Sequence, residues 1–180
     1  MPSFQFASAT LSYAEVAYET LGDVLFRLVK IHGLRTESSI NRFVDLGSGG
    51  GKAVFAAYFT GLFFSCMGIE LLPRLHRASK QYLRFFKRQI LSHDEADELT
   101  AEKKIDFVQC DFTYLDWSAG VAATAESGQF HEGGTQEEEI VVVLAIAASF
   151  DLGMRRRVAL IANRLPVGSF FICTTYKYGS

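Results

Sequence analysis

The stretch FVDLGSGGGK, residues 43–52, decides the fold of this chain of 180 residues. It opens with a short apolar run that contains one acid, Asp45, and this pattern predicts a buried strand. Gly47, Gly49 and Gly51 follow, and glycine allows the positive φ angles and the close backbone approach that a ligand-binding loop needs. Apolar residues then recur at helical spacing. The stretch therefore predicts a strand, a glycine loop and the start of a helix.

Two well-known nucleotide-binding loops do not fit this spacing. A dinucleotide-binding loop has a third glycine at the position that Lys52 occupies here. A phosphate-binding P-loop has Ser or Thr after its lysine, where this chain has Ala53. The N-terminus of the predicted helix still offers unpaired N–H groups and a positive dipole end to an anionic group. A ligand at this loop is therefore expected, but neither nucleotide motif is present.

The rest of the chain continues the alternation of strands and helices. Further strands are predicted over residues 65–71, 105–112, 140–147 and 169–176, and further helices over residues 11–32, 73–90 and 154–165. Alternating strands and helices predict an α/β fold with right-handed crossovers and helices on both faces of the sheet. We expect a three-layer, Rossmann-like domain with a mostly parallel five-stranded sheet in the order 3-2-1-4-5.

Composition indicates a globular protein. Hydrophobic residues make up 49% of the chain and charged residues 21%, which excludes disordered and disulfide-scaffold classes. The 18 basic and 20 acidic residues give a net charge of −2, so no overall field attracts nucleic acid. The three cysteines lie far apart in apolar stretches and predict buried free thiols in a reducing, intracellular compartment. No Cys/His group has the spacing of a metal site, so no metal is expected.

One uncharged segment has to be considered as a possible membrane-spanning helix. Residues 53–69 carry no charge, and their length is at the lower edge of what a spanning helix needs. Thr60 and Gly61 interrupt the segment, which favours a helix, a turn and a buried strand. No membrane partner is therefore expected.

Acidic residues end the second and third predicted strands. Glu70 follows Asp45 by one strand-helix-strand unit, and an acid there is placed to accept the hydroxyls of a ribose. Asp111 and Phe112 end the third strand, where a carboxylate and a ring suit an adenine. Because the carboxyl ends of parallel strands meet at one edge of a sheet, these groups are expected to converge there.

These motifs together resemble a known family. The stretches VDLGSGGG, GIE and QCDF are similar to the signature of class I S-adenosylmethionine-dependent methyltransferases, over residues 43–176. The stretches SYAEVAYETL, FVDLGSG and ASF further resemble the non-SET histone-lysine methyltransferase family, of the disruptor-of-telomeric-silencing type. The resemblance implies a methyltransferase fold, S-adenosylmethionine as cofactor and transfer of its methyl group to a protein lysine, with histones as candidate substrates.

The resemblance also implies roles for residues at the predicted sheet edge. The implied cofactor contacts are Asp45, Gly47 and Gly49 at the methionine end, Glu70 at the ribose, and Asp111 and Phe112 at the adenine. Leu71 is a further implied cofactor contact. An upstream tyrosine and glutamate would close over the methionine part. Two registers match this upstream motif, Tyr13 with Glu15 and Tyr18 with Glu19, and the first is slightly favoured.

Several positions depart from the family pattern. Phe150 matches, but Ala148 and Ser149 stand where the family has two asparagines that help shape a lysine channel. The implied catalytic contacts are Ser149, Phe150 and Tyr13. Lys52 occupies a position where the family has a neutral amide. The chain ends just after the fifth predicted strand, where this fold usually adds a closing strand pair.

The acceptor is less well defined by sequence than the cofactor. Methyl transfer is an in-line displacement that needs orientation and a dry channel rather than a local base. RNA or a small molecule is therefore an alternative acceptor, and a cofactor-binding module without turnover is a further alternative. A basic helix offers a nucleic-acid contact through Arg74, Arg77, Lys80, Arg84, Lys87 and Arg88, which otherwise form a solvated face. A histone substrate implies a nuclear location, and the other acceptors a cytoplasmic one.

The chain is expected to form one domain of residues 1–180. Residues 1–41 would form an N-terminal helical cap, and residues 42–180 the cofactor-binding α/β core. Residues 118–139 are rich in Gly, Ala and Glu and show no periodicity, which predicts a mobile insertion.

Overall fold

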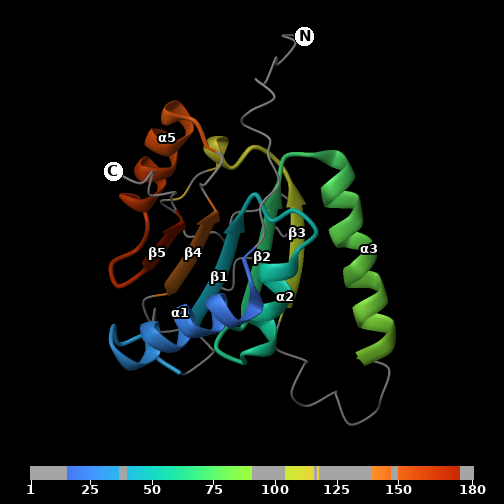
Figure 1. Cartoon of the computed structure of the whole chain (residues 1–180), viewed down its shortest axis with the longest axis horizontal. Coiled ribbons are helices and arrows are strands. Elements are labelled where there is room, and N and C mark those ends of the chain that lie inside the picture. The colour runs from blue at the N-terminus through green and yellow to red at the C-terminus, as the bar shows by residue number, and fades with distance from the viewer. Residues whose placement is uncertain are drawn as a thin grey trace, which may run out of the picture.

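The described part of the protein is built around one parallel five-stranded sheet (Figure 1). A computed structural model describes residues 16–36, 40–90, 104–115, 117, 139–146 and 150–174. The strands are β1 (Asn41–Leu46), β2 (Ser65–Glu70), β3 (Lys104–Gln109), β4 (Ile140–Ile146) and β5 (Phe170–Thr174). Their order is β3-β2-β1-β4-β5, and all four pairings are parallel. The predicted strand order and fold class are therefore confirmed.

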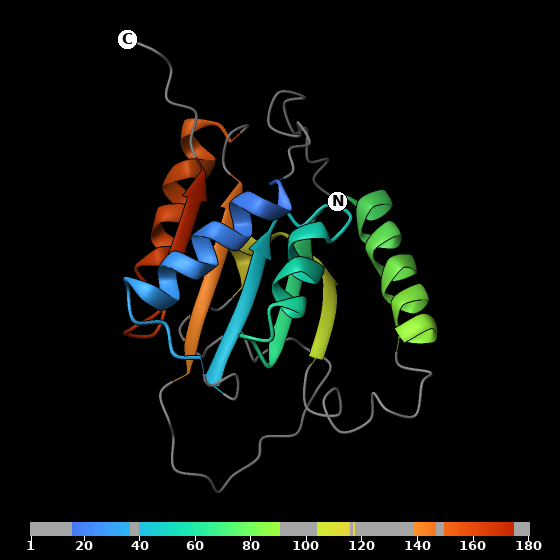
Figure 2. The ribbon, with the colours of Figure 1, turned by 60° about the horizontal axis from the view of Figure 1, so that its bottom comes forward.

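Helices cover both faces of this sheet. They are α1 (Tyr18–Lys30), α2 (Lys52–Phe59), α3 (Pro73–Ile90) and α5 (Leu152–Ala162), with a short 3-10 helix η4 (Phe112–Tyr114). Figure 2 shows α1, α2 and α3 side by side on one face, and α5 on the other. Each face therefore carries its own hydrophobic core, and the sheet is shielded from solvent between them.

Alternate strand residues supply these two cores. Phe43 of β1 packs under α1 and α2 with its ring 5.4 Å from that of Phe63, whereas Val44 faces α5. In β4 the residues from Val141 to Ala145 are all buried. A central parallel strand that is covered on both faces has such a continuous apolar run. The buried sheet fixes the positions of the loops at its carboxyl edge.

Some predicted boundaries were wrong. The third strand ends at Gln109, not at Phe112, because the Asp111 side chain accepts hydrogen bonds from Thr113 and turns the chain into η4. The first helix spans Tyr18–Lys30, and residues 11–15 lie outside the described residues, as do residues 118–138 of the expected insertion. Cys66 is buried, but Cys173 is exposed on β5, contrary to the prediction.

The uncharged segment of residues 53–69 folds as α2, a turn and β2. Gly61 has a φ of 74° in that turn, which lets the chain reverse between the two elements. No helix among the described residues is both long and apolar enough to cross a bilayer. The alternative of a spanning helix at this segment is therefore not supported.

Gly51, the residue before α2, is expected to be intolerant of a side chain. Its φ is 89°, and an added Cβ would overlap the ring of Phe107, which is only 2% exposed and has little room to move. Left-handed backbone strain of about 1–2 kcal/mol and overpacking of about 1–3 kcal/mol then add. Thermal denaturation of Gly51→Ala should show a Tm roughly 6–12 °C below wild type.

Gly168 provides a matched control for this substitution. Its φ is 87°, nearly that of Gly51, but no atom lies within 4 Å of an added Cβ. Gly168→Ala therefore reports backbone strain without the clash and should lower the Tm by only a few degrees. Equal losses in the two variants would show that Phe107 does not pack against the glycine loop as described.

Candidate functional site

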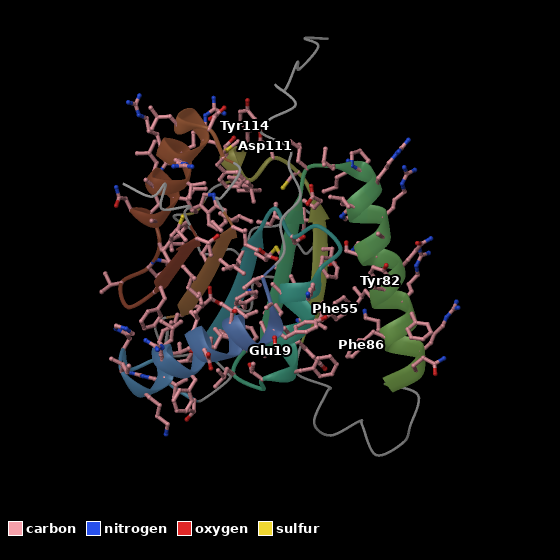
Figure 3. All side chains as sticks on the ribbon, in the orientation of Figure 1. Glu19, Phe55, Tyr82, Phe86, Asp111 and Tyr114 are labelled. Atoms are coloured by element: carbon pink, nitrogen blue, oxygen red, sulfur yellow. The ribbon has the colours of Figure 1, made fainter. Side chains whose placement is uncertain are left out.

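The carboxyl edge of the sheet brings together the acids that the sequence singled out. Asp45 lies one residue before the end of β1, and Glu70 is the last residue of β2. Both are buried, with exposed fractions of 3% and 6%. Asp111 follows β3 at the same edge and is labelled in Figure 3. The predicted convergence of Asp45, Glu70 and Asp111 on one edge is therefore observed in the strand topology.

The glycine loop is fixed by backbone hydrogen bonds to the neighbouring strand. The N–H groups of Gly47 and Ser48 both donate to the carbonyl of Ile69, over 2.8 and 3.0 Å. The Gly51 N–H donates to the Ser48 carbonyl over 2.8 Å and closes the turn into α2. Positive φ angles of 78° at Gly47, 55° at Gly49 and 89° at Gly51 make this path available. Hydrogen bonds to β2 and within the turn therefore fix the path of the loop.

The Glu70 carboxylate is hydrogen-bonded to the backbone of this loop. Its Oε2 accepts the Gly49 N–H over 2.8 Å, and its Oε1 accepts the Leu72 N–H over 2.7 Å. Each carboxylate oxygen has a second lone pair. Glu70 therefore combines a structural role, which the sequence did not predict, with room to accept ligand hydroxyls.

Asp45 is a buried acid whose charge is poorly compensated. Its Oδ1 has no hydrogen-bond partner among the described residues. Burial, and then repulsion from the Glu70 carboxylate, raise the pKa of Asp45 to about 7. A buried polar group without a partner costs free energy unless something outside the chain satisfies it. The Asp45 carboxylate is therefore suited to accept a hydrogen bond from a cationic ligand group.

Ser48, in the glycine loop, also has a buried side-chain oxygen without a partner among the described residues. The sequence pattern did not indicate a role for this residue. Its Oγ is buried and makes no hydrogen bond within the described residues. A Cβ on Gly68 of β2 would lie 2.6 Å from this Oγ, so Ser48 fits only because Gly68 has no side chain. Its only sequence signal was its place between two glycines, since the contact with β2 depends on the tertiary fold.

Asp111 and η4 form a turn that packs on the hydrophobic core between the sheet and α5. Asp111 Oδ1 accepts from the Thr113 N–H over 2.9 Å and from the Thr113 hydroxyl over 2.7 Å. Phe112 is 8% exposed, and its ring lies 6.2 Å from that of Phe150. The Trp117 indole donates to the Phe112 carbonyl over 3.1 Å. Hydrogen bonds thus fix Asp111 and Phe112, the residues predicted to contact the adenine, and the ring of Phe112 lies near that of Phe150.

The upstream contacts remain predictions. Tyr13, Glu15 and Ser149 lie outside the described residues. In the second register, Tyr18 begins α1, and its ring centroid lies 4.6 Å from the Lys52 Nζ at the start of α2. This cation–π contact places Tyr18 beside the glycine loop. Glu19 is exposed on the same turn, and Leu71 is half-buried after β2.

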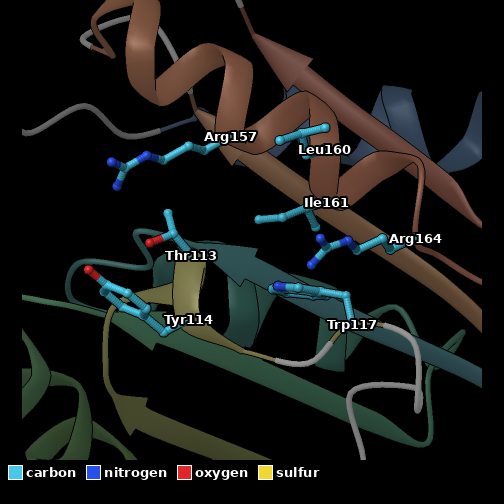
Figure 4. A pocket seen from close by; sticks show the side chains of 7 residues that line it. All are labelled: Thr113, Tyr114, Trp117, Arg157, Leu160, Ile161 and Arg164. Carbon is cyan, nitrogen blue, oxygen red and sulfur yellow. The ribbon is translucent and has the colours of Figure 1, made fainter.

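Two hollows on the described surface are not lined by Asp45, Glu70 or Asp111. A cavity of about 220 Å³ separates η4 from α5, and Figure 4 shows the side chains that line it: Thr113, Tyr114, Trp117, Arg157, Leu160, Ile161 and Arg164. A groove of about 380 Å³, lined by apolar residues such as Leu25 and Phe59, runs between α1 and α2. Because neither includes the buried acids, the candidate site is the carboxyl edge of the sheet at the glycine loop.

Known structures share this fold. A candidate RNA methyltransferase from Pyrococcus horikoshii matches with a TM-score of 0.56 and 12% identity, over 98% of this chain and 67% of that protein. An S-adenosylmethionine-dependent methyltransferase from Clostridium acetobutylicum matches with a TM-score of 0.52 and 13% identity, over 88% of this chain and 50% of that protein. The described chain therefore has the class I methyltransferase fold, and it spans half to two thirds of these two proteins.

The sequence itself gives no such match. No protein-family model and no curated protein matches the chain. At identities of 12% and 13% the structural likeness establishes the fold and nothing finer. The cofactor, the reaction and the acceptor therefore have to be argued from the site.

Proposed function

We propose that the chain binds S-adenosylmethionine at the carboxyl edge of its sheet and acts as a methyltransferase. The observation that carries this proposal is the buried Asp45 carboxylate, whose Oδ1 has no hydrogen-bond partner among the described residues, beside a glycine loop with positive φ angles. The amino acid part of the cofactor has an ammonium group that can donate to this carboxylate. Charge-assisted hydrogen bonds of this kind are roughly twice as strong as neutral ones.

The remaining donors and acceptors at the edge fit the rest of the same molecule. Glu70 has free lone pairs at the end of β2, where this fold class binds a ribose. Gly47 has open space where a side chain would stand, so a ligand can approach its backbone closely. The Asp111 turn offers a carboxylate at the neighbouring strand end. The residues present therefore fit the three parts of S-adenosylmethionine.

The bound cofactor would supply an electrophilic methyl group on a sulfonium. The chain would contribute orientation, because the loop and Glu70 are locked to each other by hydrogen bonds. Phe150 follows β4 at the same edge, and its ring packs near Phe112. An aromatic wall there would exclude water from the acceptor. The acceptor atom would have to present a free lone pair, and the methyl group would pass to it as S-adenosylhomocysteine leaves. No residue of the chain is assigned as a base.

RNA or a small molecule is the acceptor class that we favour. Support comes from the RNA assignment of the Pyrococcus protein and from Ala148 and Ser149, which replace the paired asparagines of the lysine methyltransferases. A protein lysine, including a histone lysine, rests on the sequence resemblance alone and is the second candidate. Nuclear location belongs to that second candidate.

A labelling experiment separates these acceptors. Purified protein and methyl-labelled S-adenosylmethionine are incubated in parallel with total RNA, with core histones and nucleosomes, and with a small-molecule extract. We expect label in RNA or in small molecules. Label in histones alone would instead support the lysine methyltransferase. Cofactor binding without label in any fraction would indicate a binding module without turnover.

Phe150→Ala tests the catalytic assignment within the same assay. Loss of the ring should loosen the acceptor channel and lower turnover by about tenfold or more, since small misplacements of reacting groups are costly. Affinity for S-adenosylhomocysteine should change by no more than about twofold, because Phe150 is not among the assigned cofactor contacts. An equal loss of affinity and turnover would place Phe150 in the cofactor pocket instead.

A further inference from the structure

The outer face of α3 concentrates positive charge. Of its 18 residues none is acidic, whereas six are Arg or Lys. The chain as a whole has a net charge of −2, so this helix is a strong local exception. Figure 3 shows Phe86 pointing from α3 toward Phe55 of α2, while nitrogen-tipped side chains extend from the opposite side of the helix. The buried and the charged faces of α3 are thus cleanly separated.

Lys80 does not belong to this charged face. Its Nζ lies 2.7 Å from Asp106 Oδ1 of β3, so its charge is paired. The other five cations of α3 are exposed, and no acidic side chain in the described part of the chain pairs with them. The five cations that define the α3 basic face are Arg74, Arg77, Arg84, Lys87 and Arg88.

One exposed aromatic ring accompanies these cations, that of Phe85, which is 65% exposed. On a helix of 3.6 residues per turn, Phe85 points within about 20° of Arg74 and about 60° from Arg88, so it lies on the same face. Tyr82 is also exposed, but it points roughly 140–160° away from Arg77 and Arg84 and lies outside this face. Cations that contact phosphates, together with rings on which bases can stack, are the features of a single-strand binding surface.

The α3 basic face leads to the candidate site. Arg74 comes four residues after Glu70, and Arg88 lies 14 residues further along the helix, about 21 Å at 1.5 Å per residue. Figures 1 and 2 show α3 at the rim of the molecule, beyond β3, with its N-terminal end at the carboxyl edge of the sheet. A single nucleic-acid strand bound along this face would therefore reach the edge of the sheet where Glu70 lies.

We propose that the α3 basic face binds single-stranded RNA and guides it toward the carboxyl edge of the sheet. The exposed Phe85 ring favours unpaired bases over a duplex, whose bases are already stacked. RNA commonly presents unpaired bases in loops, bulges and ends. Binding of RNA by α3 stands by itself, but its role as the methyl acceptor rests on the proposed function.

Fluorescence anisotropy with a labelled, unpaired RNA of about 20 nucleotides tests this proposal. The triple variant Arg77→Ala, Arg84→Ala, Arg88→Ala should bind at least about tenfold more weakly than wild type. Because each phosphate contact on a single strand contributes about −0.7 to the slope of log K against log salt, the slope should lose about 2. Phe85→Ala should weaken binding of this RNA by about fivefold or more, and binding of a duplex much less.

A matched variant and a cofactor assay make the outcomes distinguishable. The control is a second triple variant, which removes the same charge from exposed positions on α1 and α5: Arg27→Ala, Lys30→Ala, Arg156→Ala. It should retain wild-type RNA affinity. Equal losses in both triple variants, tighter binding to duplex DNA, or no RNA binding by wild type would each overturn the proposal. S-adenosylhomocysteine should raise the Tm of both triple variants as in wild type. RNA binding without a rise in Tm on addition of S-adenosylhomocysteine would refute the proposed function but support RNA binding by the α3 basic face.

Discussion

Asp45→Asn is expected to stabilise the ligand-free protein at about pH 8 while removing its affinity for S-adenosylhomocysteine. The wild-type carboxylate is buried beside Glu70 without a partner for Oδ1 among the described residues, and these surroundings raise its pKa from 3.8 to about 7. Such a shift corresponds to an unfavourable contribution of about 4 kcal/mol once the group is charged. A neutral amide avoids this cost, so the Tm should rise by roughly 10 °C.

The stability difference between wild type and Asp45→Asn is expected to grow as the pH rises. Because the folded-state pKa of Asp45 lies above its unfolded value of 3.8, its stabilising contribution is complete below pH 3.8 and is lost as the pH rises toward about 7. Between about pH 5.5 and pH 8, wild type should therefore lose about 2 kcal/mol relative to Asp45→Asn. Thermal or urea denaturation of both proteins across this range measures the difference.

A surface acid provides the control for this series. Asp23 is exposed on α1, and Asp23→Asn should change stability by less than about 0.5 kcal/mol at either pH. If Asp45→Asn were less stable than wild type at about pH 8, the Asp45 carboxylate would be paired within the protein. The argument for a ligand ammonium at this position would then fail.

Gly47→Ala is expected to abolish cofactor binding, with a loss of a hundredfold or more in affinity, while the protein remains folded. No atom lies within 4 Å of a Cβ at this position, so the new methyl group fills open space at the sheet edge. That space is where the proposed cofactor approaches the backbone. The φ of 78° adds strain of only about 1–2 kcal/mol, which lowers the Tm by a few degrees.

Gly33→Ala separates the two effects in Gly47→Ala. Gly33 has a φ of 76° and nothing within 4 Å of an added Cβ, but it follows α1, away from the glycine loop. Both variants should lose similar stability, and only Gly47→Ala should lose binding in calorimetry with S-adenosylhomocysteine. Normal affinity in Gly47→Ala would place the cofactor elsewhere on the protein.

Local patterns were sufficient to predict the fold and the outline of the site. The apolar runs of β1 and β4 and the glycines between Asp45 and α2 are local signals, and the parallel direction of the strands follows from the alternation of strands and helices. The position of Glu70 at the end of β2 followed from the same pattern. These features depend on residues that are close in sequence.

Contacts between distant segments were not predictable in the same way. The Glu70 bond to the Gly49 N–H joins residues 21 apart, and the pairing of Lys80 with Asp106 joins residues 26 apart. The buried Ser48 hydroxyl depends on the absence of a side chain at Gly68 on another strand. The end of β3 was misplaced because Asp111 caps η4 with its side chain, which competes with continuation of the strand.

Calorimetric titration of the wild-type protein with S-adenosylhomocysteine tests the central claim most directly. One site per chain is expected, and saturation at about 100 times the dissociation constant should add about 2.7 kcal/mol to stability. Affinity should be about tenfold higher at about pH 8 than at about pH 6, because Asp45 with its pKa near 7 has to be charged to accept the ligand ammonium. A folded sample that gives no binding heat at either pH would contradict the cofactor site.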